Sequence, residues 1–196
     1  MNSPTSESEN QTDPVHTVLR GIVWTGHAAA WLILPILMLV LLGVVLSAAK
    51  VGTFASWESD VFLFGSKLSL ASIGDMQWHL FGIMLMLSLA GALVSDKHVR
   101  VDILRQHMSE RGKAWVDLIG HLIFLLPFAI IVVWHGLDFT SRSFSMGEGS
   151  DYDGLYDRFL LKSFIPIGFS LLTAAGLGLA IIHLRKIFKK RQVDHD

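Results

Sequence analysis

The sequence contains no cysteine and few charged residues. Without cysteine, the chain has no disulfide, no thiolate nucleophile and no cysteine-ligated zinc or iron–sulfur site, and it gives no sign of a redox compartment. Charged residues make up 17% of the 196 residues and hydrophobic residues 52%, whereas soluble domains average about 25% charged residues. This balance is typical of a membrane protein. The opening stretch, MNSPTSESENQTDP, lacks the basic region and the cleavage site of a signal peptide, and we expect a disordered polar tail there.

Four long apolar segments follow, at residues 22–49, 76–94, 114–137 and 163–184. Because a helix rises about 1.5 Å per residue, each segment is long enough to cross about 30 Å of hydrocarbon. Only helices and closed barrels satisfy their backbone amides in lipid, and the segments lack the ten-residue alternation of barrel strands. We therefore predict an all-α membrane protein with four transmembrane helices. Its membrane domain would span residues 21–188, between a polar tail at 1–20 and a basic, polar tail at 189–196.

Basic residues near the ends of these segments predict the orientation. The loop between the second and third segments and the C-terminal tail each carry five, namely Lys97, Arg100, Arg105, Arg111 and Lys113, and Arg185, Lys186, Lys189, Lys190 and Arg191. Residues 50–74 hold only two basic residues, and residues 138–162 hold three beside five acidic ones. The positive-inside rule then places both termini in the cytoplasm and these two loops outside. Aromatic residues among polar ones in residues 50–74 indicate a short amphipathic segment in the headgroup region.

The second outer loop, DFTSRSFSMGEGSDYDGLYDRFLLK, is rich in aspartate and glycine. Such a composition is compatible with calcium binding. However, the D-x-D-x-D-G spacing of the calcium-binding helix-loop-helix is missing, and acidic outer loops are common. We therefore predict no metal site.

Residues 94–104, VSDKHVRVDIL, place His98, Arg100 and Asp102 one valine apart. The alternation favours an extended segment with the three polar side chains on one face. Asp102 would then cap a short amphipathic helix that begins at Ile103. The trio could act as a proton relay or as an anion site, but its chemistry favours an ion-paired surface turn at the membrane boundary.

Histidines suggest an alternative function. His27 and His121 are expected near the inner side of the membrane, and His79 and His135 near the outer side. Two pairs at matching depths would suit a heme-binding four-helix cytochrome subunit, although histidines near helix ends often form interfacial hydrogen bonds. Neither a serine nucleophile motif nor a His-Glu metal motif is present, so we predict that the chain is not an enzyme.

The stretch DMQWHLF is interpreted as the start of the second helix. Asp75 would lie near the positive end of the helix dipole, and Gln77 and Trp78 would anchor the helix at the outer interface. Trp78 fits a lipid-facing aromatic belt and a subunit contact equally well. Asp75 and Trp78 are the candidate contacts to another subunit.

Three stretches carry a family resemblance. MQWHLFGIMLMLSLAGALVSDKHVRVDIL resembles the second helix and following loop of the small integral membrane subunit (DctQ-like) of tripartite ATP-independent periplasmic (TRAP) transporters, in the mannitol or chloroaromatic branch. AWVDLIGHLIFLLPFAIIVVW is similar to the family's third helix, and GEGSDYDGLYDRFLLKSFIPIGFSLL to its outer loop and fourth-helix entry. The positions that match the family's motifs, or that we take to be structural, are Gln77, Trp78, His98, Arg100, Asp102, Glu148, Ser150 and Lys162.

The resemblance implies a transporter component in the bacterial inner membrane. A periplasmic solute-binding protein would capture an organic acid, a large membrane subunit would move it by sodium symport, and this chain would support the large subunit. No cofactor and no nucleic-acid partner is implied. Because the chain ends soon after the fourth helix, we expect a separate small subunit rather than a fused form. Consistent with a supporting role, no apolar segment carries the paired glycine or proline interruptions that build midplane ion sites, and Pro35 is a single candidate for a kink.

Overall fold

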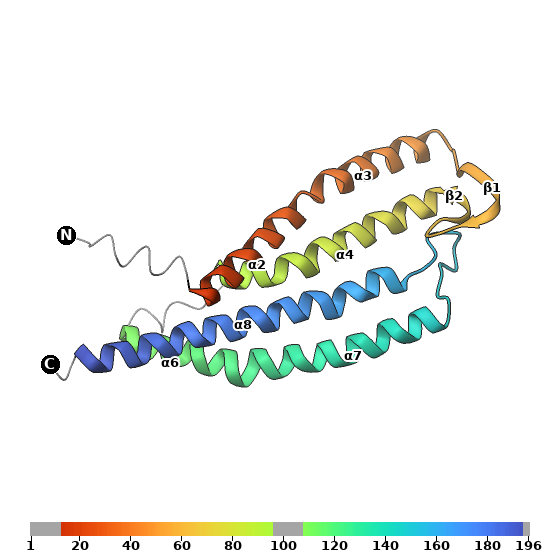
Figure 1. Ribbon diagram of the computed structural model, residues 1–196. Coiled ribbons are helices and arrows are strands. Elements are labelled where there is room, and N and C mark those ends of the chain that lie inside the picture. The colour runs from red at the N-terminus through yellow and green to blue at the C-terminus, as the bar shows by residue number, and fades with distance from the viewer. Residues whose placement is uncertain (1–12, 96–107, 194–196) are drawn as a thin grey trace.

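The computed structural model of the chain describes residues 13–95 and 108–193. Four helical spans are long and apolar enough to cross a membrane: Pro14–Ala48, Leu70–Val94, Glu110–Ser145 and Phe159–Phe188. They run along one another as an elongated bundle, with the start of the first span and the end of the last at one end and a β-hairpin at the other (Figure 1). The predicted four-helix membrane architecture is confirmed. We call the two ends of the bundle the terminal end and the hairpin end.

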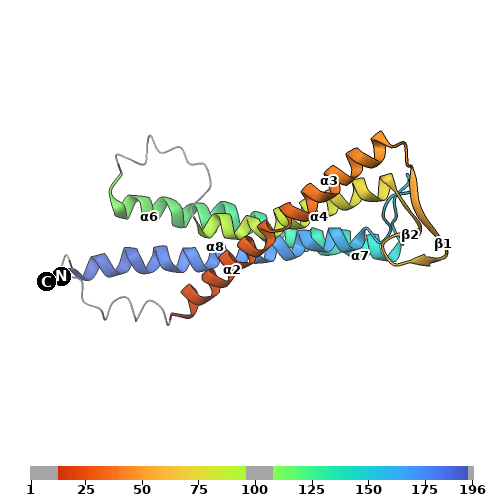
Figure 2. The ribbon, with the colours of Figure 1, turned by 90° about the horizontal axis from the view of Figure 1, so that it is seen from above.

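The first span consists of two helices, α2 (Pro14–Ala30) and α3 (Ile33–Ala48). Helix α2 begins inside the stretch expected to be a polar tail, because the Asp13 carboxylate accepts a hydrogen bond from the backbone N–H of Val15 and a proline fits the first helical turn. The helix is interrupted at Trp31 and Leu32, one turn before Pro35, whose missing N–H cannot bond the Trp31 carbonyl. Beyond this break α3 leans away from the bundle, and none of its residues is buried (Figure 2).

A hairpin follows α3, formed by the antiparallel strands β1 (Thr53–Val61) and β2 (Gly65–Ser69). The sequence predicts an interfacial amphipathic segment here but no strands. Gly65 has a φ of +62°, and a Cβ added to it would lie 2.2 Å from the Tyr156 ring, so only glycine fits this turn. The indole N–H of Trp57 donates to the Gly65 carbonyl and ties the two strands together.

Helix α4 (Leu70–Val94) begins directly where β2 ends. Ser69 caps it: its hydroxyl accepts from the Ser72 backbone N–H, and the Ser72 hydroxyl accepts from the Ser69 N–H. The predicted helix start at DMQWHLF is therefore wrong, because these two serines satisfy the free amides more than a turn earlier. Near its other end α4 packs closely on α2, where a Cβ on Gly91 would lie 3.4 Å from the Gly26 Cα.

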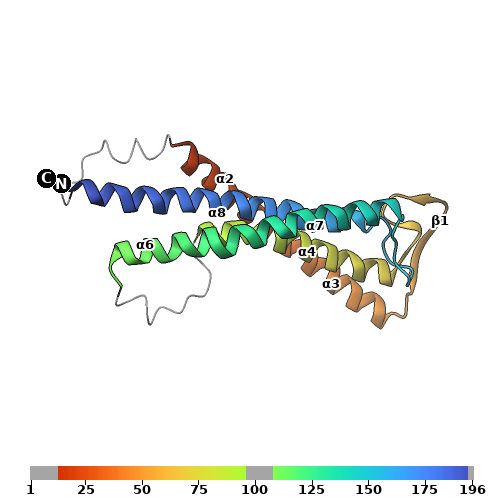
Figure 3. The same ribbon diagram turned by 90° about the horizontal axis from the view of Figure 1, so that it is seen from below.

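The third span joins α6 (Glu110–Ile119), a π-helical segment η1 (Gly120–Leu125) and α7 (Leu126–Ser145). The π segment ends just before Pro127, which lacks the N–H that a regular α-helical turn would use. Helix α8 (Phe159–Val193) packs along α7, and the two approach closely where a Cβ on Gly136 would lie 3.2 Å from Pro166 (Figure 3). The largest buried cluster joins four elements and consists of Leu19, Ile22, Ala90, Ala129, Leu172 and Ala175.

Candidate functional site

A network of ion pairs and hydrogen bonds holds the loop between α7 and α8 at the hairpin end. The Asp75 carboxylate of α4 accepts a hydrogen bond from the backbone N–H of Leu155 (3.1 Å) and lies 3.5 Å from the Arg158 guanidinium. Leu155 is fully buried. The fit is tight, because a Cβ on Gly154 would lie 2.1 Å from the same carboxylate oxygen. Asp75 therefore anchors a loop of its own chain from within the helix rather than sitting at the helix start.

A second ion pair joins Glu148 of this loop to Lys162 of α8. The Lys162 ammonium also lies 3.9 Å from the centroid of the Phe139 ring on α7, so it links α7, α8 and the loop. The hydrogen bond from Lys162 lowers the pKa of Glu148 below its usual value. Glu148 and Lys162 are both among the residues singled out from the sequence, and the structure brings them together.

The hairpin is tied to the same loop. The Ser69 and Ser72 hydroxyls both donate to the Asp153 carbonyl, at 2.7 and 3.3 Å. The Leu63 backbone N–H donates to the Asp157 carboxylate at 3.2 Å. The hairpin, the start of α4 and the loop thus form one connected unit. We call these contacts, together with the two ion pairs above, the hairpin-end network. Ser150, the remaining predicted residue of the loop, accepts a long, local hydrogen bond from the Tyr152 N–H (3.4 Å).

Gln77 and Trp78 have different surroundings on α4. The Gln77 side-chain amide donates to the Leu39 carbonyl of α3 at 3.0 Å, so it fastens the leaning helix to the bundle. Trp78 is 70% exposed and meets Phe81 edge to face. Its indole ring faces outward, where lipid or another subunit can reach it.

Among the described residues, the histidines of the heme interpretation make no ring contact within the predicted pairs. His121 is buried and stacks on His183 of α8, with 5.6 Å between ring centroids, and His183 is not among the predicted ligands. His27 and His135 are exposed on α2 and α7. His79 and His121 each place Nδ1 next to the backbone carbonyl four residues earlier, at 2.7 and 2.5 Å. Within residues 13–95 and 108–193, no group of three or more histidine, aspartate or glutamate side chains could hold a metal ion.

The motif residues His98, Arg100 and Asp102 lie in residues 96–107, outside the part of the chain that the structure describes. The extended segment and the helix cap proposed for them remain predictions.

Comparison with known proteins identifies the family. The family model described as "Tripartite ATP-independent periplasmic transporters, DctQ component" matches residues 61–186. No curated protein and no solved structure matches the chain. The matched region begins in the hairpin and ends in α8, so it contains α4, the third span and most of the hairpin-end network. Since the match covers well over half of the chain, the chain belongs to the DctQ family, the small permease subunits of tripartite ATP-independent periplasmic transporters.

Proposed function

We propose that this subunit supports the large membrane subunit of a TRAP transporter in sodium-driven uptake of an organic acid, which a periplasmic binding protein delivers. The family match is the observation that carries this proposal. The mannitol or chloroaromatic branch suggested by the sequence is a further proposal about the solute. It rests on the resemblance of the second-helix motif alone.

The distribution of ionisable side chains supports a stabilising rather than an ion-carrying role. In α8 no ionisable side chain lies between Lys162 and His183, and in α4 none lies between His79 and the end of the helix. The ion pairs of the described chain lie toward the ends of the bundle, as in the Glu148 to Lys162 pair. At the break between α2 and α3, the Trp31 carbonyl already accepts a hydrogen bond from the Leu34 N–H. The break therefore does not leave this oxygen unbonded, as an ion site built from free carbonyls would need. These features favour a rigid support over a midplane ion site.

For topology, we propose the bacterial inner membrane with both termini in the cytoplasm. The basic residues Arg111, Lys113, Arg185 and Lys186 lie on α6 and α8 toward the terminal end, which supports this orientation. The hairpin end would then face the periplasm, where a solute-binding protein could reach it.

Single cysteines test this topology in the cysteine-free chain. Ser109 caps α6 and Ser145 ends α7, so about 36 residues of helix, or roughly 50 Å, separate them. A membrane-impermeant maleimide should label Ser145→Cys from the periplasm and Ser109→Cys only from the cytoplasm. Labelling of both from the same side would contradict the proposed topology.

Reconstitution tests the function itself. Proteoliposomes with this chain alone should take up no solute, whereas the chain with the large subunit, the binding protein and an inward sodium gradient should. Omitting this chain from the complete system should abolish uptake. Solute uptake by the chain alone without sodium, or full uptake without the chain, would refute the proposal.

A further inference from the structure

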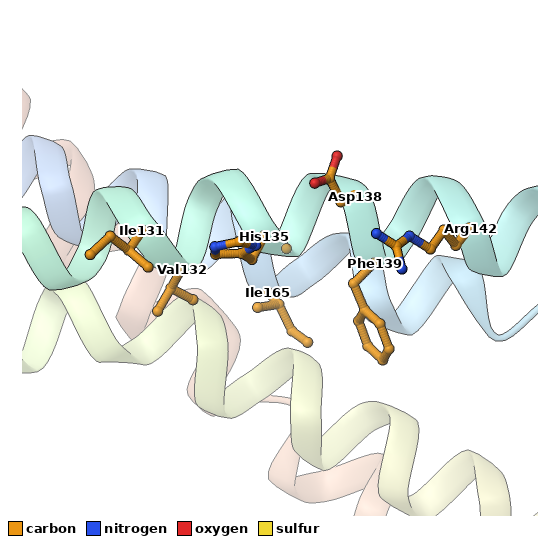
Figure 4. Close-up of a pocket in the computed structure, with 8 residues that line it drawn as sticks. Ile131, Val132, His135, Asp138, Phe139, Arg142 and Ile165 are labelled. Atoms are coloured by element: carbon orange, nitrogen blue, oxygen red, sulfur yellow. The ribbon is translucent and has the colours of Figure 1, made fainter.

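The outward side of α7 carries ionisable side chains without partners among the described residues of the chain. His135, Asp138 and Arg142 are all exposed and lie three and four residues apart on α7. In the described part of the chain, none of these side chains makes a hydrogen bond or an ion pair. Together they line an open groove of about 480 Å³, whose other walls are Ile131, Val132, Gly136, Phe139 and Ile165 (Figure 4). We call His135, Asp138 and Arg142 the α7 stripe.

The stripe lies in the outer part of a membrane-spanning segment. In α8, residues 163–182 contain no ionisable side chain, and about 20 residues of helix cover about 30 Å, the thickness of the hydrocarbon layer. Lys162 therefore marks one edge of this layer, and it contacts Phe139, the neighbour of Asp138. Asp138 lies at the same edge, and His135 lies about one turn further into the layer.

An ionisable side chain that faces lipid inside this layer is costly and usually has a protein partner, and His135 lies at such a depth. Asp138 and Arg142 are four residues apart and could neutralise each other in part, but this would leave the His135 imidazole against lipid. Helix α3 offers a contrast, because its exposed side chains are almost all apolar and need nothing but lipid. The α7 stripe is thus a polar surface beside an apolar groove, which a polypeptide can cover more favourably than acyl chains can.

We propose that the α7 stripe is the surface on which this chain binds its large membrane subunit, an inference that rests on the function proposed above. A transmembrane helix of that subunit lies in the groove and packs against Ile131 and Ile165. Its polar or charged side chains pair with Asp138 and Arg142 and satisfy His135. This arrangement places the contact on the third span, away from α3.

Photo-crosslinking from two matched positions tests the location. Ile131 beside the stripe and Leu41 on α3 are 57% and 55% exposed, and both face away from the bundle core. A benzophenone amino acid at each position is irradiated in membranes that contain the large subunit. We expect a crosslink to the large subunit from Ile131, at least tenfold stronger than from Leu41. Equal or stronger crosslinking from Leu41 in a complex that still co-purifies would overturn the docking surface and leave the proposed function standing. Failure of the unsubstituted chain to co-purify the large subunit would overturn both.

Charge removal tests the chemistry. Asp138→Asn keeps the size of the side chain but removes its charge, and Asp151→Asn is the matched control on an exposed loop aspartate. We expect Asp138→Asn to reduce co-purification of the large subunit about tenfold, because an interfacial charge loses its partner. The membrane yield of the chain expressed alone should not change, since Asp138 has no partner within the described chain. If Asp138→Asn and Asp151→Asn co-purify the large subunit equally well, the stripe only reaches toward the headgroups and the proposal is wrong.

Discussion

Removal of the Asp75 carboxylate should release the loop between α7 and α8. This carboxylate accepts a hydrogen bond from the buried Leu155 N–H and faces Arg158, and within the described residues that N–H has no other acceptor. Asp75→Ala leaves the amide without its acceptor and removes the ion pair. Asp75→Asn keeps an oxygen that can accept from Leu155 and loses only the charge.

The two contacts set the size of the effect. A hydrogen bond to a charged group contributes about 1.5–3 kcal/mol, and a partly exposed ion pair about 0–1 kcal/mol. The ion pair belongs at the low end, because the Asp75 and Arg158 side chains remain 26% and 33% exposed. We therefore expect Asp75→Ala to cost about 2–3 kcal/mol of local stability and Asp75→Asn about 1 kcal/mol. At about 1.4 kcal/mol per factor of ten, loop opening becomes roughly 30- to 140-fold more frequent in the first variant and about fivefold in the second.

Hydrogen–deuterium exchange of the detergent-solubilised protein measures this opening. Amide exchange in a folded protein reports local unfolding, so a peptide containing Leu155 should exchange faster by these factors. Asp151→Ala serves as the control, because Asp151 is an exposed aspartate in the same loop. If Asp75→Ala exchanges no faster than Asp151→Ala, the anchoring role of Asp75 is refuted. If Asp75→Asn is as fast as Asp75→Ala, the charge rather than the amide hydrogen bond holds the loop.

Three further predictions concern the same network. Gly154→Ala puts a Cβ 2.1 Å from the Asp75 carboxylate, so it should speed exchange of the loop like Asp75→Ala, and the double variant should show little additional effect. The folded-state pKa of Glu148 is lowered, so its contribution to stability is present above the ordinary glutamate pKa of about 4.3 and is lost as the pH falls through the lower folded value. Thermal unfolding should therefore separate wild type from Glu148→Gln at pH 7, with the difference shrinking below about pH 4; a constant difference would contradict the assignment. Ser69→Ala removes a helix cap worth about 0.5–2 kcal/mol and should speed exchange at the start of α4, whereas Ser66→Ala, on an exposed strand residue, should not.

The sequence predicts the four spans well because their signal is local. Each span needs only an apolar run of sufficient length, and lipid leaves the backbone little choice besides a helix. The ends are harder to predict, because a cap depends on one or two side chains. Asp13 and Ser69 both start their helices before the apolar runs begin, so α2 and α4 are longer than hydropathy indicates.

The two strands of the hairpin are not predicted from the sequence, for a different reason. Residues 53–61 show no regular alternation of apolar and polar side chains, and their pairing with β2 is irregular between Ser56 and Val61. The strands are held instead by distant groups, including the Tyr156 N–H, which donates to the Leu63 carbonyl at 2.8 Å. Gly65 is the one local signal, since its positive φ marks the turn.

The sequence identifies several residues of the hairpin-end network but not which of them contact each other. Glu148 and Lys162 stand out by family resemblance, and Asp75 as a carboxylate beside an apolar run. The contact of Asp75 with Leu155 links positions 80 residues apart. A single sequence contains no information on such a distance, whereas Gly154, whose hydrogen atom faces the carboxylate, gives a hint only after the fold is known.

The two polar regions toward the hairpin end of the bundle differ in how their charges are satisfied, and this difference separates folding from assembly. At the hairpin end, Asp75 and Glu148 each face a basic partner within the chain, so those charges fix the subunit's own shape. On α7, His135, Asp138 and Arg142 have no such partner among the described residues, although His135 would face lipid in an isolated subunit and Asp138 lies at the edge of the hydrocarbon layer. A subunit of a complex can carry charged side chains that are unpaired within its own chain. The free-energy cost of these unpaired charges is removed when the partner subunit covers them on assembly. Substitutions in the hairpin-end network should therefore alter the subunit alone, whereas substitutions in the α7 stripe should alter only the complex.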